Sequence, residues 1–251
     1  MNDNAAKPRL GIRDIVHPRA VAVFGASDNK DKFGGRVMHY LTRHGYAGRI
    51  VPINPNRAEV LGIPAYPSID KAPGPIDVAM LTVPAGALLR SVAACAEAGV
   101  GCCVIMTTGF AEAGGDEGRE RQRQLVEIAR RSGMRIVGPN CMGLISPLAK
   151  MALTSSLVLE IDRIQTGRIG LVSQSGALMV SIFNRAHDAA IGFSLCVSLG
   201  NQCDLEICDF IDYLVEDPET DAICVYVEGF VDGQRFLRSA EACRKAGKPL
   251  V

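Results

Sequence analysis

Short apolar runs alternate along the first half of the chain with segments whose apolar residues recur at helical spacing. The runs that predict strands are Val21–Phe24, Ile50–Ile53, Val78–Val83, Cys102–Met106 and Arg135–Val137. The segments that predict helices are Gly34–His44, Leu88–Ala98 and most of Asp116–Arg131. Continuous apolar strands between amphipathic helices are typical of a parallel sheet covered on both faces. The pattern therefore predicts a doubly wound α/β unit.

The alternation stops at an irregular stretch, Ser146–Gln165, and then restarts. Further strands are predicted over Arg168–Val172, Phe193–Ser198 and Ala222–Val227, and helices over Gly176–Ala189, Leu205–Val215 and Gln234–Ala246. Lys248–Val251 begins one more strand, so the second unit is expected to be incomplete. A length of 251 residues also suits about two domains. We expect one domain over residues 1–148 and a second over 149–251.

Composition narrows the class of protein. Lys+Arg and Asp+Glu each total 27, which argues against the basic surface of a nucleic-acid binder. No apolar run approaches the ~18 residues of a membrane span, and the start, Met1–Pro8, has no signal peptide. The nine cysteines form no Cys-x-x-Cys pair, so zinc ribbons and thioredoxin-type chemistry are not expected. Reduced thiols and a cytoplasmic location fit this usage best.

The turn after the first strand has the composition of a phosphate loop. Gly25-Ala26-Ser27 follows the strand and Gly34 opens the next helix, so backbone N–H groups and a helix N-terminus converge there. The second strand ends in Asn54-Pro55-Asn56-Arg57, without the acidic residue that binds the ribose of NAD. Arg57 suits a phosphorylated ligand, which leaves NADP and coenzyme A as candidates. A glycine-rich connection without a ligand is the alternative.

A second strand-to-helix turn, Ser173-Gln174-Ser175-Gly176, offers hydroxyls and N–H groups that cap a helix or bind phosphate. No Gly-x-Ser-x-Gly elbow with a matching His/Asp pair is evident, which argues against a serine hydrolase. No Gly-x-x-x-x-Gly-Lys-Ser/Thr motif occurs either. A nucleotide site is therefore expected outside any P-loop of this chain.

Several local signatures occur in one order from about Val16 to Val251. They are Val23-Phe24-Gly25-Ala26-Ser27, Ile53-Asn54-Pro55-Asn56, Val83-Pro84-Ala85, Thr108-Gly109-Phe110-Ala111-Glu112, Gly138-Pro139-Asn140-Cys141-Met142-Gly143, Val172-Ser173-Gln174-Ser175-Gly176-Ala177, Ser198-Leu199-Gly200-Asn201, Asp217-Pro218-Glu219-Thr220 and Tyr226-Val227-Glu228-Gly229. This series resembles the ADP-forming acetyl-CoA synthetase family, whose superfamily includes the α subunit of succinyl-CoA synthetase. The resemblance implies a Rossmann-like CoA-binding domain followed by a flavodoxin-like ligase domain.

The resemblance also implies which residues contact coenzyme A. In order from the phosphates to the thiol, the matching positions are Gly25, Ala26, Ser27 and Gly34 with Arg57, then Val83, Pro84 and Ala85 at the adenosine, Thr107, Thr108 and Gly109 along the pantetheine, and Asn140 and Cys141 at the thiol end. Cys141 by itself is more typical of a buried structural thiol, because the reacting sulfur belongs to the cofactor.

In the family, a histidine carries phosphate to the acid, and CoA then cleaves the acyl phosphate. The positions that match its phosphate site are Ser173, Gln174, Ser175, Gly176 and Ala177, with the turn Gly200 and Asn201. Glu228 matches the glutamate that orients the histidine. His17, His39, His44 and His187 match no family motif, and the phosphorylated loop would follow Val251. ATP or GTP with Mg²⁺ is expected on a nucleotide-grasp domain or β subunit, and no metal site is expected here.

Three hypotheses follow. The first is the CoA-binding part of an acid–CoA ligase, working as an oligomer with a small carboxylic acid as substrate and binding CoA without turnover on its own. The second is a CoA-binding regulatory module of a lysine acetyltransferase-type protein. The third is an NADP-dependent oxidoreductase, which would leave the later motifs unexplained. The sequence names neither the acid nor the nucleotide.

Overall fold

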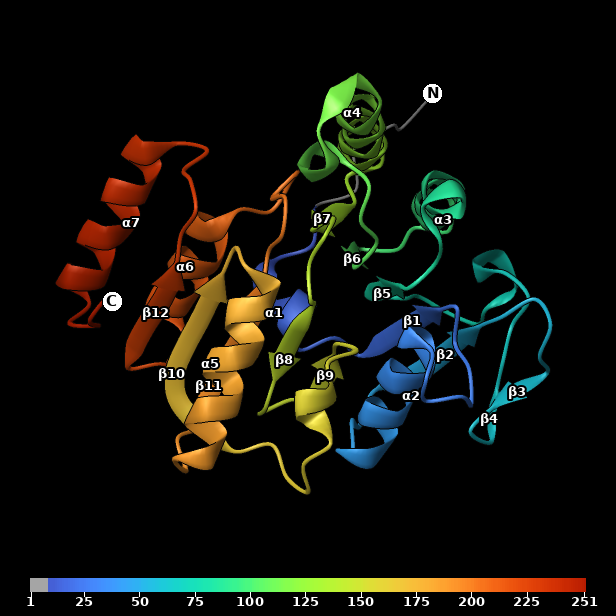
Figure 1. Cartoon of the computed structure of the whole chain (residues 1–251), viewed down its shortest axis with the longest axis horizontal. Coiled ribbons are helices and arrows are strands. Elements are labelled where there is room, and N and C mark those ends of the chain that lie inside the picture. The colour runs from blue at the N-terminus through green and yellow to red at the C-terminus, as the bar shows by residue number, and fades with distance from the viewer. Residues whose placement is uncertain (1–8) are drawn as a thin grey trace, which may run out of the picture.

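The computed structural model describes residues 9–251, and the segment Met1–Pro8 lies outside the described residues. The chain forms two five-stranded sheets that lie side by side with helices against them (Figure 1). A short antiparallel pair, β3 (Glu59–Val60) and β4 (Ile63–Pro64), stands beside the first sheet. Within the described residues, no helix is long and apolar enough to cross a membrane.

The first sheet is parallel and has the order β2-β1-β5-β6-β7. Its strands are β1 (Ala20–Phe24), β2 (Arg49–Ile53), β5 (Val78–Leu81), β6 (Cys102–Ile105) and β7 (Arg135–Val137). The side chains of β1 alternate between two apolar clusters, one with helix α2 (Phe33–Arg43), the other with α3 (Ala85–Glu97) and α4 (Gly115–Ser132). Both faces are therefore covered, as the apolar strands predicted. The order reverses between β1 and β5, which is where ligands bind in doubly wound folds.

The second sheet has the order β12-β10-β11-β8-β9. Strands β10 (Thr166–Ser173), β11 (Phe193–Ser198) and β12 (Ala222–Tyr226) are parallel, and the hairpin β8 (Leu144–Ser146) and β9 (Met151–Leu153) joins β11 in antiparallel fashion. Helix α5 (Gly176–Asp188) covers one face, and α6 (Ile207–Glu216) covers the other with α7 (Gly233–Lys245) packed beside it. The sheet is the flavodoxin-like unit that the sequence predicted.

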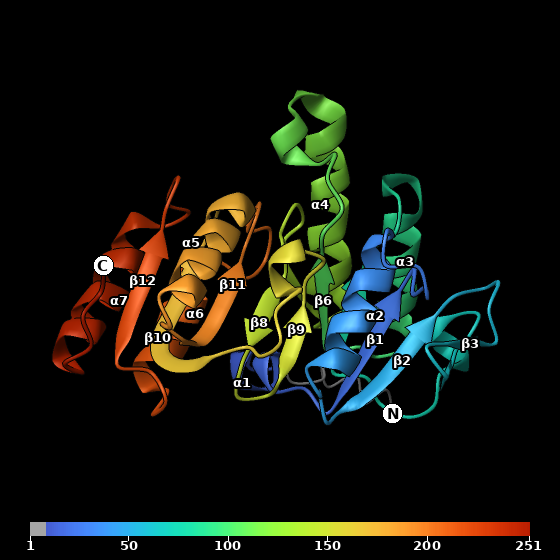
Figure 2. The ribbon, with the colours of Figure 1, turned by 60° about the horizontal axis from the view of Figure 1, so that its bottom comes forward.

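One apolar core continues beneath both sheets. The same buried cluster contains Val23 and Val104 of the first sheet, Val197 of the second and Leu214 of α6. The two units are therefore packed together and not merely tethered. Figure 2 shows the consequence, because strands β1, β6, β11 and β12 all point toward the same end of the molecule.

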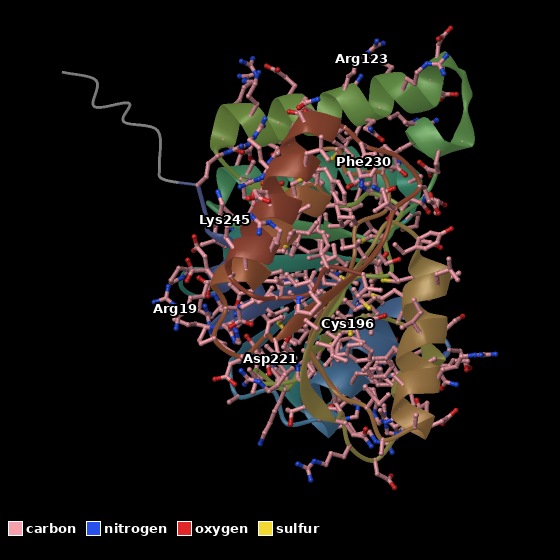
Figure 3. All side chains as sticks on the ribbon, turned by 90° about the vertical axis from the view of Figure 1, so that its left-hand side faces the viewer. Arg19, Arg123, Cys196, Asp221, Phe230 and Lys245 are labelled. Atoms are coloured by element: carbon pink, nitrogen blue, oxygen red, sulfur yellow. The ribbon has the colours of Figure 1, made fainter. Side chains whose placement is uncertain are left out.

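Many charged side chains lie on the outer faces of helices α4 and α7. Arg123 of α4 points away from the protein in Figure 3, and the side chains of Arg123 and of Lys245 on α7 are both about 70% exposed. Many of these charges pair along their own helix, for example Arg123 with Glu120 at 2.6 Å. Such exposed pairs contribute little stability, so the shared core must supply most of it.

The junction between the sheets is closed by the segment after β11. Gly200 has a φ of +55°, and a Cβ at this position would fall 2.2 Å from the carbonyl oxygen of Pro139. The N–H of Asn201 donates to that same oxygen at 2.9 Å. Asp204 accepts from the N–H of Ile136 and pairs with Arg135 at 2.8 Å. Only glycine permits this approach of the two backbones.

All predicted elements are present, and the observed elements that were not predicted are short. Every strand and helix expected from the periodicity is present within a few residues of its predicted bounds, and Leu250 pairs with Ile223 at the start of the expected last strand. The stretch Ser146–Gln165, expected to be irregular, instead contains β9 and the short 3₁₀ helix η3 (Leu157–Leu159). The predicted boundary at residue 148 falls inside the β8–β9 hairpin. Since β8 pairs with β11, we propose to place the division before Leu144.

Remaining short elements complete the chain. They are helix α1 (Ile12–Val16) and the 3₁₀ turns η1 (Ile69–Lys71) and η2 (Ala111–Ala113). The sequence pattern did not single out these segments, nor β3 and β4, because each is too short to show a period.

Replacing Gly200 by alanine tests the junction. The added methyl would clash with the backbone of Pro139 and Asn140, so we expect the free energy of unfolding in urea to fall by about 2–4 kcal/mol. Gly233→Ala is the matched control, since nothing lies within 4 Å of a Cβ at the start of α7. Equal stability of the two variants would contradict the proposed role of the Gly200 approach.

Candidate functional site

A cavity of about 1190 Å³ opens at the carboxyl ends of the strands of both sheets. Its walls come from the turns after β5, β6, β7, β10 and β12, from the start of α2, and from the β9–η3 segment. The lining residues are Phe33, Arg36, Thr82, Val83, Pro84, Ala85, Met106, Thr107, Thr108, Asn140, Cys141, Met142, Ser155, Ser156, Leu157, Val158, Gln174, Ser175, Gly176, Ala177, Val180 and Glu228. The cavity is thus larger than the ~300–1,000 Å³ typical of small-ligand sites.

Two groups of residues predicted from separate halves of the sequence meet in this cavity. Val83, Pro84, Ala85, Thr107, Thr108, Asn140 and Cys141 come from the first sheet, and Gln174, Ser175, Gly176, Ala177 and Glu228 come from the second. The positions expected at a cofactor and those expected at a phosphate therefore face one space. This juxtaposition is the feature that the linear order of the motifs did not show.

The first glycine-rich turn lies beside the cavity at Thr82. Gly25 has a φ of +74°, and a Cβ on Gly34 would fall 2.1 Å from the Gly25 carbonyl oxygen and 2.8 Å from Oγ1 of Thr82. Ala26 and Ser27 are buried, and Ser27 Oγ accepts the N–H of Asn29 at 3.1 Å. The turn therefore brings main chain, and not bulky side chains, to the edge of the cavity.

Arg57 also lies near this turn. It forms an ion pair with Asp28 at 3.6 Å and is more than half exposed. Asn54, on the same segment, donates to the carbonyl oxygen of Ala26 at 2.7 Å. The segment after β2 is thus hydrogen-bonded to the candidate phosphate loop. Arg57 lies beside that loop and does not line the cavity.

The turn after β6 is organised by its own polar groups. Thr107 Oγ1 donates to the carbonyl oxygen of Val83 at 2.7 Å, which joins two turns that line the cavity. Thr108 is exposed at the cavity wall. Gly109 has a φ of +97° and donates its N–H to Glu112 at 2.6 Å, so it fixes the conformation of the turn. Gly109 itself does not line the cavity.

Cys141 is a buried thiol at the cavity wall. It is 3% exposed, and its Sγ lies 3.2 Å from the carbonyl oxygen of Ile105. Burial raises the pKa of the Cys141 thiol to about 12. The side chain therefore stays neutral at physiological pH, which fits a packing role and not nucleophilic chemistry. Asn140, next to it, has a φ of +57° and donates from its amide to Asn201 at 3.3 Å.

The start of α5 is the clearest anion-binding geometry in the cavity. Ser175 is the N-cap and its Oγ accepts the N–H of Leu178 at 3.4 Å. Ser173 Oγ donates to the carbonyl oxygen of Ser175 at 2.7 Å and fixes the turn. The N–H groups of Gly176 and Ala177, in the first turn, have no helical partner and lie at the positive end of the helix.

Glu228 approaches α5 from the turn after β12. Gln174 holds this turn, because its Oε1 accepts the N–H groups of Glu228 and Gly229 at 2.6 and 3.0 Å and its Nε2 donates to Gly229. The Glu228 side chain is exposed in the cavity. Among the lining residues, Arg36 carries the positive charge and Glu228 the negative charge.

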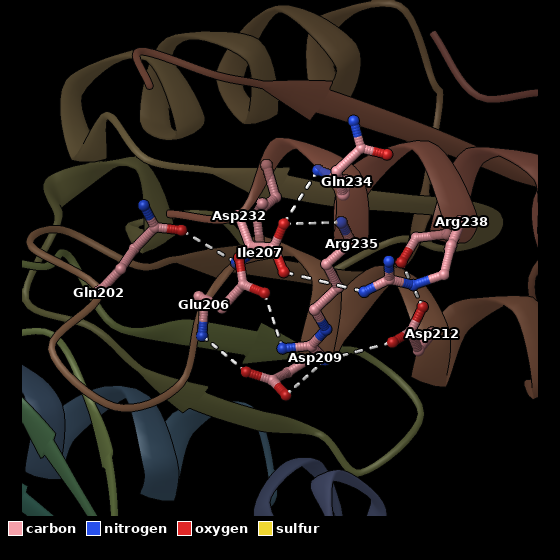
Figure 4. A network of polar contacts seen from close by, with 10 residues as sticks. Gln202, Glu206, Ile207, Asp209, Asp212, Asp232, Gln234, Arg235 and Arg238 are labelled. Carbon is pink, nitrogen blue, oxygen red and sulfur yellow. Dashed lines mark hydrogen bonds and ion pairs between the residues drawn. The ribbon is translucent and has the colours of Figure 1, made fainter. Parts of the chain in front are cut away.

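A network around Arg235 anchors the far end of the turn that bears Glu228 (Figure 4). The guanidinium of Arg235 binds Glu206 at 2.7 Å, Asp209 at 2.8 Å and Asp212 at 3.2 Å, all from α6 or its cap. Asp232 caps α7 by accepting the N–H groups of Gln234 and Arg235. The turn between β12 and α7 is thus fixed at both ends.

The turn of Gly200 and Asn201 does not line the cavity. The N–H of Asn201 is bonded to Pro139, and its side-chain amide donates to Gln122 at 2.9 Å and to Glu112. These contacts join β11 to α4 and the turn after β6. The N–H and the side chain of Asn201 thus join these elements, while the phosphate contact that the sequence predicted for Gly200 and Asn201 stays a prediction.

Sequence reasoning missed Arg36. It lies in the first turns of α2 and donates to the carbonyl oxygens of Ser155 at 3.0 Å and Asp31 at 3.4 Å, while its buried Nε has no partner among the described residues. Its guanidinium also lies 5.2 Å from the centre of the Phe33 ring. A basic residue directly after Gly34-Gly35 was the available signal, since that glycine pair marks the helix start next to the candidate phosphate loop.

The β9–η3 segment was missed as well, because it was assigned to an irregular linker. Ser155, Ser156, Leu157 and Val158 line the cavity. None of His17, His39, His44 and His187 does so. Within residues 9–251, no group of three or more His, Cys, Asp or Glu side chains is arranged to hold a metal ion.

The state of Cys141 can be measured by its pH-dependent alkylation. Since the thiolate is the reactive form and the pKa is about 12, iodoacetamide labelling at pH 7.5 should be about a thousandfold slower than for an ordinary cysteine. The rate should keep rising through pH 9–10, where an unfolded thiol levels off. Peptide mass spectrometry gives the rate, and the urea-unfolded chain is the control. Rapid labelling of the folded chain at pH 7.5 would contradict the buried neutral thiol.

Each of the two units matches a known protein-family model. The model described as a CoA binding domain matches residues 19–147, and the model described as a succinyl-CoA ligase like flavodoxin domain matches residues 166–251. The chain is 39% identical to acetate–CoA ligase [ADP-forming] I of Archaeoglobus fulgidus, covering 94% of this chain and 33% of that protein. It is 38% identical to acetate–CoA ligase [ADP-forming] II subunit alpha of Pyrococcus furiosus, covering 94% and 50%.

A solved structure agrees in fold. The dinucleotide forming acetyl-coenzyme A synthetase 1 of Candidatus Korarchaeum cryptofilum, in complex with phosphate and ADP, superposes with a TM-score of 0.88 at 33% identity, over 95% of this chain and 50% of that one. The chain thus spans a third to a half of the length of these relatives. It belongs to the ADP-forming acyl-CoA synthetase family, in which a CoA-binding domain precedes a succinyl-CoA-ligase-like flavodoxin domain.

Proposed function

We propose that this chain is the coenzyme A-binding part of an acid–CoA ligase that forms a nucleoside diphosphate. The observation that carries the proposal is the single cavity in which the CoA-motif residues of the first sheet face the α5 N-terminus of the second. The overall reaction would convert an acid, CoA and a nucleoside triphosphate to acyl-CoA, nucleoside diphosphate and phosphate. The relatives' names support this reaction class. The comparisons support neither the acetyltransferase-type module nor the NADP-dependent oxidoreductase.

The described residues fit coenzyme A. The turn at Gly25–Ser27 and Gly34 offers main-chain groups for phosphate, with Arg57 at the rim. The apolar residues Val83, Pro84 and Ala85 would lie against the adenosine. Thr107, Thr108 and Gly109 would line the path of the pantetheine. Asn140 and Cys141 lie where the thiol would end. Bound there, CoA supplies the nucleophilic sulfur, and the neutral Cys141 does not compete with it.

We propose that Arg36 is the principal cation for the anionic part of the ligand. Its guanidinium lines the cavity, is neutralised by no carboxylate among the described residues, and has a buried Nε without a partner. A buried donor left unsatisfied costs about 1–3 kcal/mol. A phosphate oxygen that accepts from this nitrogen would remove that cost and add an ionic hydrogen bond.

The start of α5 would hold the phosphate of an acyl phosphate. Ser173 and Gln174 fix the turn, while Ser175, Gly176 and Ala177 offer hydroxyl and N–H groups to an anion. Glu228 is placed to accept a hydrogen bond from the N–H of an imidazole that enters the cavity, and so to set the tautomer of that ring. None of the histidines among the described residues lines the cavity, so we propose that this imidazole comes from outside residues 9–251, and that the site for ATP or GTP with Mg²⁺ belongs to a nucleotide-grasp domain or β subunit. Residues 9–251 alone would then bind CoA without turnover.

Isothermal titration calorimetry with CoA tests the proposal directly. We expect saturable binding with one CoA per chain, and weaker binding of NADP⁺ measured in parallel. Absence of any heat of binding at millimolar CoA would overturn the assignment of the cavity.

Substituting Arg36 tests its role in that binding. Arg36→Gln should weaken CoA binding roughly tenfold or more, because a charge-assisted hydrogen bond contributes about 1.5–3 kcal/mol. The difference in CoA affinity between the parent chain and Arg36→Gln should be smaller in 0.5 M salt, because salt screens the ionic attraction that Arg36 contributes. Arg244→Gln, at the exposed end of α7, is the matched control and should bind like the parent chain. Unchanged affinity in Arg36→Gln would refute the role.

A further inference from the structure

One wall of the cavity is apolar and is not explained by the CoA-binding motifs. Met142, Val158 and Val180 line it, and Leu157 stands at its mouth with 66% of its surface exposed. The three half-buried side chains rest on the core of the second sheet, against residues such as Met179 and Phe183. Their packing holds them in place, so the wall is preformed.

This apolar wall begins where the α5 N-terminus ends. Val180 follows Gly176 by four residues on the same helix, so it lies on the same face about one turn, or ~5.4 Å, further along. Met142 packs against the first turn itself, since a Cβ on Gly176 would fall 2.4 Å from Met142 Cγ. An acyl phosphate whose phosphate group is held at Gly176 and Ala177 would therefore have an apolar surface directly beside its acyl group.

Past Val180 the space continues along α5, with a polar lining of Ser181, Asn184 and Arg185. A second hollow of about 460 Å³ is lined by Leu157, Val158, Val180, Ser181, Asn184 and Arg185. It shares Leu157, Val158 and Val180 with the main cavity. A group larger than a methyl could thus extend along α5 without meeting the cofactor side of the cavity.

We propose that Met142, Val158 and Val180 form the acyl pocket, and that the substrate is a carboxylic acid with a branched or aromatic apolar group. This inference rests on the proposed function. The reacting carboxyl must lie both at the thiol end, beside Asn140 and Cys141, and at the phosphate site on α5. From that point the rest of the acid meets the apolar wall. The single methyl of acetate would leave most of this wall facing water.

Acyl-CoA thioesters report on the pocket without requiring turnover. CoA, acetyl-CoA, isobutyryl-CoA and phenylacetyl-CoA would be titrated into the chain by calorimetry. We expect isobutyryl-CoA and phenylacetyl-CoA to bind at least roughly tenfold more tightly than acetyl-CoA, because each additional buried methylene is worth about 0.8 kcal/mol.

Two variants assign that gain to the wall. Val180→Ser and Val158→Ala should each reduce the ratio of phenylacetyl-CoA to acetyl-CoA affinity by roughly threefold to tenfold while CoA affinity stays unchanged. Ile182→Ala, on the same helix but lining neither hollow, is the matched control. Thermal melting confirms that each variant is folded, and Val158→Ala, on η3, serves if Val180→Ser melts early.

The outcomes separate the two proposals. If CoA binds but phenylacetyl-CoA binds no more tightly than acetyl-CoA, the acyl pocket is refuted and the CoA site stands. If the wall variants weaken CoA itself as much as phenylacetyl-CoA, the wall contacts the pantetheine and the acyl pocket is again refuted. If CoA does not bind at all, the proposed function fails. A tenfold gain that Val180→Ser or Val158→Ala reduces supports the pocket.

Discussion

The shared apolar core is the constraint on which the rest of the structure depends. Because one buried cluster runs from β1 through β11 to α6, the two sheets cannot turn independently of each other. The carboxyl ends of both sets of parallel strands therefore open on one side. Loops at those ends carry the binding groups in folds of this class. The position of the cavity is thus a consequence of burying apolar surface, and the polar groups within it add chemistry to a place that packing has already defined.

Main-chain N–H and carbonyl groups form much of the surface around this site, and glycine residues allow them to approach each other closely. Gly34 lets α2 begin against the Gly25 carbonyl, and Gly200 lets the β11 turn lie on Pro139. Each contact brings N–H or carbonyl groups together where any side chain would separate them. The lining then needs few charges. Arg36 comes from α2 beside the first sheet and Glu228 from the turn after β12 of the second, so a ligand with an anionic portion can be oriented by charge as well as by shape.

The polar networks behind the cavity support its geometry. Gln174 links the α5 turn to the Glu228 turn, and Arg235 links α7 to three carboxylates of the α6 region. Asn201 and Asp204 bind the second sheet to the first. None of these groups needs to touch a ligand in order to matter. They restrict the positions of the turns that do, which is how a site made of loops becomes rigid enough to be specific.

The sequence by itself determined the α/β class, the two units, and nearly all strands and helices, because long periodic runs leave little ambiguity about what is buried. It also identified most lining residues, through motifs such as Val83-Pro84-Ala85 and Ser173–Ala177. The tertiary structure decided what no local pattern encodes. It brought the two motif groups into one cavity, moved the hairpin β8–β9 into the second sheet, gave Asn201 a fastening role, and exposed Arg36 and the Met142–Val158–Val180 wall. Those features depend on contacts between residues far apart in the chain, where packing and hydrogen-bond satisfaction, and not local propensity, set the outcome.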